Sequence, residues 1–98
     1  MVQYVVGHLK SLKNAEKMGE YRNVAADALA KHGGKIVVPP TKPERIEGDD
    51  PAPQAIVLLS FPSAAAARAW RDDPNLAQIH ALRHAGADIS FFLLETGP

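Results

Sequence analysis

The chain has 98 residues, the size of one domain, which we assign to residues 1–98. Its 11 basic and 11 acidic residues cancel, which argues against a nucleic-acid or membrane partner, and the absence of cysteine excludes disulfides and thiolate metal centres. The longest apolar runs, 55–59 and 64–67, are far shorter than the ~20 residues of a membrane span. The N-terminus lacks the pattern of a signal peptide, so we expect a cytoplasmic protein.

The first third of the chain predicts a strand followed by a helix. Residues 2–9 are rich in valine and tyrosine, with apolar side chains on both faces of the predicted strand. Residues 13–31 repeat apolar side chains at three- and four-residue steps, which is typical of an amphipathic helix. We expect Asn14 or Ser11 to cap this helix and the glycines at 33–34 to end it.

The middle of the chain predicts an interrupted strand and a central strand. Residues 35–38 are β-branched, but the prolines at 39–40 offer no N–H to a neighbour and are expected to interrupt pairing. In this interpretation residues 45–47 resume the strand and residues 48–53 form a loop. Residues 54–61 are apolar on both faces, which is typical of a central strand covered on both sides.

The last third predicts helical segments and a final strand. Ser63 is expected to cap a helix that begins with four alanines and carries Trp70. Asp73 and Pro74 predict a second helix start, with aspartate as cap and proline at the first helical position. Residues 89–94 predict the last strand, again apolar on both faces.

The order β-α-β-β-α-β predicts a ferredoxin-like α+β fold: a four-stranded antiparallel sheet with both helices on one face. The strands at 2–9, 54–61 and 89–94 are nevertheless apolar on both faces. A bare apolar sheet face would exceed the few hundred Å² that monomers usually expose. We therefore expect a homodimer in which two sheets stack. The stacked face is either that of Ile56 and Leu58 or the opposite one, that of Val57 and Leu59.

Several short motifs occur in a characteristic order along residues 4–97: YVVGHL, KHGGKIVV, ERIEGDDPAP, SFPS, AAARAW, DDPNL and FFLLETG. In order and spacing they resemble the bacterial family called domain of unknown function 1330. The resemblance implies the dimeric α+β-barrel form of the ferredoxin-like fold and assigns no reaction. Proteins with the same dimeric fold include cofactor-independent monooxygenases, lactone isomerases and haem-binding enzymes.

Five residues are candidates for a functional site. His8 or Glu47 would act as a general base, because imidazole and carboxylate groups accept protons near neutral pH. Arg83 and Tyr21 would orient a substrate or stabilise an enolate, and Trp70 would contact it. Each has a structural alternative: a half-buried histidine at a strand end, a surface ion pair of the carboxylate, and core packing of the tyrosine and tryptophan. For Arg83 the alternative is a solvated helix face with an ion pair to an acid of the partner subunit.

His80 and His84 lie four residues apart on the last predicted helix, which places both imidazoles on one face. With Arg83 between them they could bind a carboxylate or phosphate group. The sequence has no HExxH motif and no carboxylate at matching spacing, so we expect no metal site and no cofactor.

We predict a small homodimer that binds an apolar carbonyl or phenolic compound between its sheet and its helices. The expected chemistry is proton transfer, of the isomerase or cofactor-independent monooxygenase type. One alternative is a non-catalytic binding or stress-related module whose dimer cleft holds a metabolite. A second alternative is a haem protein with His8 or His80 as the axial ligand.

Overall fold

The computed structural model describes residues 2–95, which form one sheet and a layer of helices. Along this part the elements are β1 (Gln3–Leu12), α1 (Ala15–Ala30), β2 (Lys35–Thr41), β3 (Ala55–Phe61), α2 (Ala64–Asp72), the short 3-10 helix η1 (Pro74–Leu76), α3 (Ala77–Gly86) and β4 (Ala87–Leu94). The sheet order is β2-β3-β1-β4 and every neighbouring pair is antiparallel. The predicted ferredoxin-like α+β fold is confirmed. Within residues 2–95, none of the helices has the length and apolar character needed to cross a membrane.

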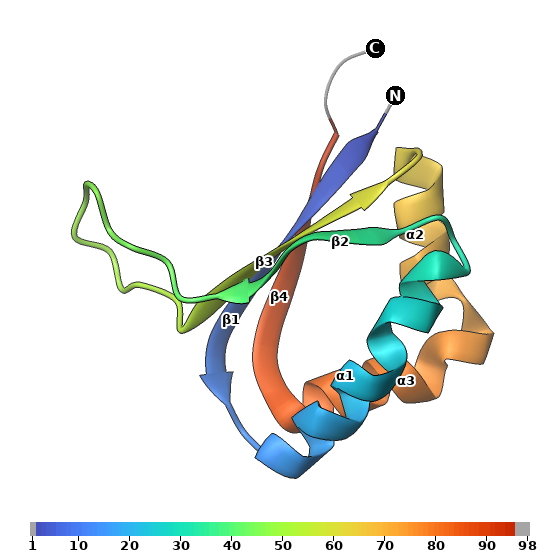
Figure 1. Ribbon diagram of the computed structural model, residues 1–98, viewed down its shortest axis with the longest axis horizontal. Helices are drawn as coiled ribbons and strands as arrows, with labels where there is room; N and C mark the ends of the chain where they lie inside the picture. The colour runs from blue at the N-terminus through green and yellow to red at the C-terminus, as the bar shows by residue number, and fades with distance from the viewer. Residues whose placement is uncertain (1, 96–98) are drawn as a thin grey trace.

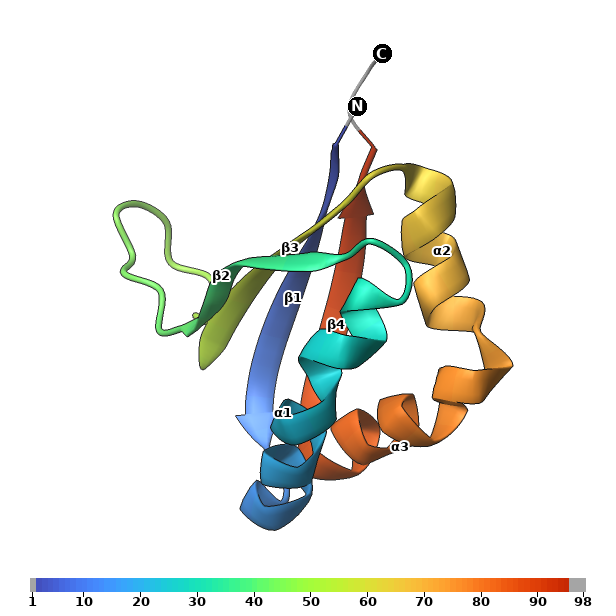
Figure 2. The ribbon, with the colours of Figure 1, turned by 45° about the vertical axis from the view of Figure 1, so that its right-hand side comes forward.

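All the helices lie on one side of the sheet, as the two ribbon views show (Figure 1, Figure 2). Side chains alternate across a strand, so Val57 and Leu59 point into the core beneath the helices. Ile56 and Leu58, which alternate with them, lie on the opposite face and are half-buried. The structure thus resolves which apolar set the helices cover, a choice that the sequence left open.

The helix ends follow the predicted capping. Side-chain oxygens of Asn14, Ser63 and Asp73 accept backbone N–H groups of the following turn at 3.1, 3.0 and 2.8 Å. Past the end of α1, Gly33 has a φ of 74°, a left-handed conformation that glycine adopts without a Cβ clash. Between α2 and α3 the chain turns through η1, so the predicted restart at Asp73 and Pro74 is confirmed.

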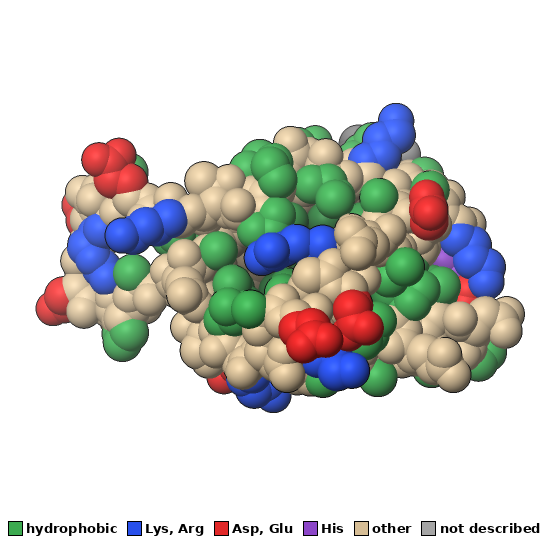
Figure 3. Space-filling model, turned by 60° about the horizontal axis from the view of Figure 1, so that its bottom comes forward, with side chains coloured by type: hydrophobic (Ala, Val, Ile, Leu, Met, Phe, Trp, Pro, Cys, Tyr) green, Lys and Arg blue, Asp and Glu red, His purple; other side chains and the backbone are tan. Residues whose placement is uncertain are grey.

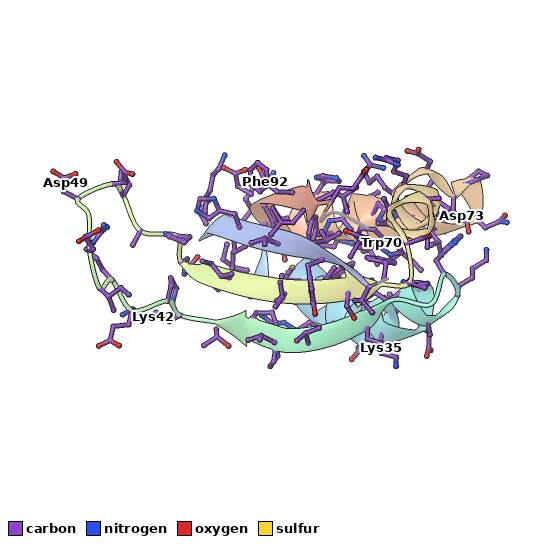
Figure 4. The ribbon with its side chains drawn as sticks, turned by 90° about the horizontal axis from the view of Figure 1, so that it is seen from above. Lys35, Lys42, Asp49, Trp70, Asp73 and Phe92 are labelled. Atoms are coloured by element: carbon purple, nitrogen blue, oxygen red, sulfur yellow. The ribbon has the colours of Figure 1, made fainter. Side chains whose placement is uncertain are left out.

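For the middle of the chain, one expectation is confirmed in part and another is wrong. β2 extends through Pro39 and Pro40 to Thr41, as an edge strand can, but its register with β3 shifts between Val38 and Thr41, so the prolines interrupt the pairing as predicted. Residues 45–47 form no strand; they belong to a loop over residues 42–54. This loop stands out from the body with acidic and basic side chains near one another (Figure 3), and Asp49 lies at its far end (Figure 4).

Candidate functional site

The most unusual side chain of the helix-covered face is Arg83, on α3, which is 1% exposed. A guanidinium keeps its positive charge under all ordinary conditions, so it cannot escape the cost of burial by losing a proton. Among residues 2–95, no carboxylate forms an ion pair with Arg83. A permanent cation is therefore buried in this core without an acidic partner.

Three aromatic rings from three different elements surround the Arg83 guanidinium. The ring centroids of Tyr21, Trp70 and Phe91 lie 5.6, 5.4 and 4.8 Å from its Cζ atom. These distances are typical of cation–π contacts, in which the negative faces of the rings attract the cation. Contributions from α1, α2 and β4 thus converge on one residue of α3.

His80, one turn before Arg83 on α3, fixes the position of the guanidinium. Its Nε2–H donates to the backbone carbonyl of Trp70 at 2.9 Å, which leaves Nδ1 as the acceptor. Arg83 Nη1 donates to that Nδ1 at 2.8 Å and makes a longer contact of 3.5 Å to the hydroxyl of Tyr21. Burial, followed by the charge of Arg83, lowers the pKa of His80, so the imidazole is neutral and both ring nitrogens are occupied.

A cavity of about 360 Å³ opens between α2, α3 and β4. Apolar side chains of β1, α2 and β4, among them Phe91, form part of its wall, and the Trp70 and Arg83 side chains also line it. In Figure 4, Trp70 of α2 lies on the side of the molecule away from the projecting loop. The remaining charged or titratable lining residues are Arg68, Arg71 and His84. This volume and apolar character are those of a site for a small organic molecule.

His84 provides a proton acceptor in the cavity wall. His84 is exposed overall, but the partial burial of its imidazole, followed by the charges of Arg83 and Arg71, lowers its pKa. At neutral pH the imidazole is therefore mostly neutral and has a free electron pair on one nitrogen. The cavity thus combines a neutral base with a fixed cation, two groups that a proton-transfer reaction can use.

Two buried donors in the walls of the same cavity have no acceptor among the described residues. These are the indole Nε1–H of Trp70 and the Nε–H of Arg83. A buried donor without a partner costs free energy, and such groups are rare in native proteins. Among the described residues, both buried side-chain donors without an acceptor therefore belong to residues that line this cavity.

The structure brings together three of the five candidate residues: Tyr21, Trp70 and Arg83. It does not bring His8 or Glu47 to them. His8 lies on the sheet face opposite the helices, because Val5 and Gly7 occupy the helix-facing positions of β1 and side chains alternate. Glu47 is exposed in the projecting loop over residues 42–54.

The sequence singled out His80 and His84 with Arg83 as a possible anion site, but it did not predict that His80 contacts Arg83 or that His84 lines a cavity. The spacing of His80 and Arg83 by three residues is a sequence signal for their contact, since residues three apart are neighbours on a helix surface. Both nitrogens of His80 are engaged, so it has no electron pair left for a haem iron or a metal ion. In the part of the chain that the structure describes, no group of three or more histidine or acidic side chains is placed to hold a metal.

The fold and the cavity together define a small ferredoxin-like α+β protein with a partly open, largely apolar cavity between α2, α3 and β4. The chain belongs to the family described as domain of unknown function (DUF1330), whose sequence profile matches residues 2–96. A comparison with functionally curated proteins finds no match.

Solved structures with the same fold come from several bacteria. RPA0582, a protein of unknown function from Rhodopseudomonas palustris, superposes with a TM-score of 0.75 at 18% identity, over 99% of this chain and 83% of that one. A dimeric ferredoxin-like protein of unknown function from Jannaschia sp. CCS1 gives 0.71 at 14% identity, over 98% and 100%. SnoaB, a cofactor-independent oxygenase from Streptomyces nogalater, gives 0.63 at 14% identity, over 99% and 93%. At these identities the likeness shows the fold alone.

Proposed function

We propose that the protein is a cytoplasmic, homodimeric enzyme that transfers a proton on a small apolar carbonyl or phenolic compound. The observation that carries this proposal is the cavity in which His84, a neutral base, and Arg83, a buried cation, line the same apolar space. Apolar walls favour an organic substrate, and the two polar groups supply the means of moving its proton.

The proposed reaction begins when His84 accepts a proton from a carbon next to a carbonyl, or from a phenolic hydroxyl. The electron pair left behind moves onto the substrate oxygen, where the charge of Arg83 stabilises it. In an isomerase the proton then returns to another carbon of the same molecule. In a cofactor-independent oxygenase dioxygen oxidises the electron-rich carbon: the carbon forms a bond to one oxygen atom, and the second oxygen leaves as water when a new carbonyl forms. SnoaB, which shares the fold, is described as an oxygenase of this type.

The geometry favours His84 over His8 and Glu47 as the base, because the latter two lie away from the cavity. Tyr21 contributes through Arg83, which it contacts with its hydroxyl and its ring. Trp70 lines the cavity directly and is therefore available to contact the substrate.

The homodimer is supported by the sheet face that the helices leave open. On this face Phe92 and Leu94 of β4 are 52% and 48% exposed, and Tyr4 of β1 is 37% exposed. Ile56 and Leu58 of β3 complete an apolar surface across the central strands. A second copy of the chain stacked on this face would cover these side chains, and the structural neighbour from Jannaschia is described as dimeric.

Proton transfer can be measured before the natural substrate is known. The probe is 2-tetralone, an apolar ketone whose hydrogens next to the carbonyl exchange with D₂O once they are abstracted. We expect the protein to accelerate this exchange, followed by NMR, and His84→Gln to lose the acceleration. The matched control is His8→Gln, the same change on the opposite sheet face, which should leave exchange intact.

Native mass spectrometry of the untagged protein tests the remaining parts of the proposal. A species of twice the protomer mass would support the homodimer, and added mass would identify a bound metabolite. If the wild-type protein binds such a compound but accelerates no proton exchange on it or on 2-tetralone, the enzyme proposal is wrong and the non-catalytic binding module replaces it.

A further inference from the structure

The cavity gathers positive charge in a chain whose net charge is zero. Three of the five arginines in the sequence line it, together with His84, and no acidic residue does. Arg68 is paired with Glu95 at 2.7 Å, and both side chains are largely exposed. Arg71 and Arg83 form no ion pair within residues 2–95. The electrostatic field in this cavity therefore favours a negatively charged occupant.

Contacts with the other described residues do not balance the positive charge of Arg83. Within residues 2–95 its hydrogen bonds to side chains use one terminal nitrogen, Nη1, and go to neutral groups of His80 and Tyr21. Its Nε–H has no acceptor among the described residues. Aromatic rings attract a cation but do not neutralise it, and a buried charge without a counter-charge is costly. A ligand that brings a negative oxygen would remove this cost.

We infer that the cavity takes its ligand as an anion: an ionised phenol, enol or carboxylic acid carried on a flat, apolar body. The negative oxygen would lie toward the Arg83 guanidinium, and the apolar body would pack against the walls formed by Trp70 and Phe91. This inference rests on the proposed function, since it uses the same cavity, and it narrows the ligand class to compounds that carry a negative oxygen when bound, including the enolate or phenolate left after His84 has taken the proton.

A matched pair of probes separates recognition of the ligand's charge from recognition of its shape. 4-Nitrophenol exists as neutral phenol and coloured phenolate near neutral pH, and 4-nitroanisole is its neutral methyl ether. Trp70 is the only tryptophan of the chain and lies in the cavity wall, so quenching of its fluorescence reports occupancy. The visible absorbance of the bound probe reports its ionisation. Both signals are measured on the intact protein across a pH series.

We expect the wild-type protein to bind the phenolate roughly tenfold or more tightly than the phenol, which lowers the apparent pKa of the bound probe. Arg83→Met should remove this preference. Arg22→Met, the same change on an exposed arginine of α1 outside the cavity, should keep it. If Arg83→Met does not fold, the ionisation of the probe on the wild-type protein still decides the matter.

Two results would overturn the inference, and they differ in what else they remove. If 4-nitroanisole and both forms of 4-nitrophenol bind equally well, the cavity does not recognise charge, although it still holds small molecules as the proposed function requires. If neither compound quenches Trp70 saturably, the cavity does not accept small rings, and both the inference and the proposed substrate site are wrong.

Discussion

The two faces of the sheet are built from the same strands but have different chemistry. On the helix-covered face Leu59 is 4% exposed, and this layer also buries Arg83 beside a cavity. On the open face Leu58, the preceding residue of β3, is only half-buried, and Val6 of β1 and Phe92 of β4 lie on the same face. The cavity lined by Arg83 and His84 belongs to the first face, whereas the second offers a broad apolar surface.

This difference shows how a strand that is apolar on both sides can serve two partners. One set of alternating residues completes the core of its own protomer, while the other set would be covered by a second copy of the chain in the proposed dimer. Function and assembly would then be separable by substitution at adjacent positions. The following predictions test that separation.

Adjacent leucines of β3 give the largest expected difference. Leu59→Asp places a carboxylate in the core beneath the helices and should cost about 4 kcal/mol or more of protomer stability, enough to unfold much of the protein. Leu58→Asp should leave the protomer folded but weaken dimerisation by about 2 kcal/mol or more. Circular dichroism melting measures the first effect, and light scattering over a concentration series measures the second.

Ile46→Asp is the control for both leucine variants. Ile46 is 92% exposed in the projecting loop, so the same change of an aliphatic side chain to aspartate should alter neither stability nor oligomeric state. If Leu58→Asp remains a dimer at all concentrations, the open face is not the dimer interface. A wild-type monomer would contradict the stacked-sheet proposal entirely.

The pH dependence of proton exchange tests the chemistry of the helix-covered face. His84 acts as a base only when neutral, and burial together with the charges of Arg83, Arg71 and Lys13 lowers its pKa from 6.5. The rate should therefore be constant above neutral pH and fall as the pH drops through a value below 6.5. His84→Gln should lower the rate about 100-fold, whereas His8→Gln on the open face should not. A profile that follows His8 instead would move the base to the other face.

The fold was largely predictable because its signals are local. Alternation along the strands, side-chain caps and glycine at a positive φ each depend on a few neighbouring residues, and Asn14, Ser63 and Asp73 all cap helices as expected. β2 was harder, because whether prolines are tolerated depends on the strand being at the sheet edge. That fact concerns the tertiary arrangement and is not visible in residues 35–41 themselves.

The candidate site was predictable only in part. Arg83, Tyr21 and Trp70 were identified, but their convergence requires three elements to pack around α3, and no sequence spacing encodes these distances. His8 illustrates the limit most clearly. Its residue type suits a base, yet a shift of one position along β1 decides which face of the sheet receives the side chain.

Gly7 tests how tightly the helix-covered face of the sheet is packed, and Gly19 is the comparison. A methyl group on Gly7 would overlap Val57 and lie 2.8 Å from the Phe91 ring, so Gly7→Ala should destabilise the protein by about 1–3 kcal/mol. A methyl group on Gly19 of α1 meets nothing within 4 Å, so Gly19→Ala should stabilise it by about 0.5–1 kcal/mol. Urea denaturation measures both. Equal effects of the two changes would mean that β1 does not approach its neighbours this closely.

The smallest expected effect concerns an ion-pair contact within the helix layer rather than its apolar packing. Asp73, before η1, accepts hydrogen bonds from Lys31 and His32 near the end of α1, both at 2.8 Å, and these contacts hold its pKa well below the ordinary value of 3.8. A lowered carboxyl pKa stabilises the folded state above the unfolded value and loses this contribution as the pH falls. Asp73→Asn should therefore lower the melting temperature at neutral pH, and the difference in melting temperature from the wild type should narrow below about pH 4.

The control is Asp72→Asn, which changes a neighbouring carboxylate that has no ion pair in the described structure. This variant should show no such difference. A difference for Asp73→Asn that stays constant with pH would mean that it does not come from the charge of Asp73, since asparagine can make the same cap.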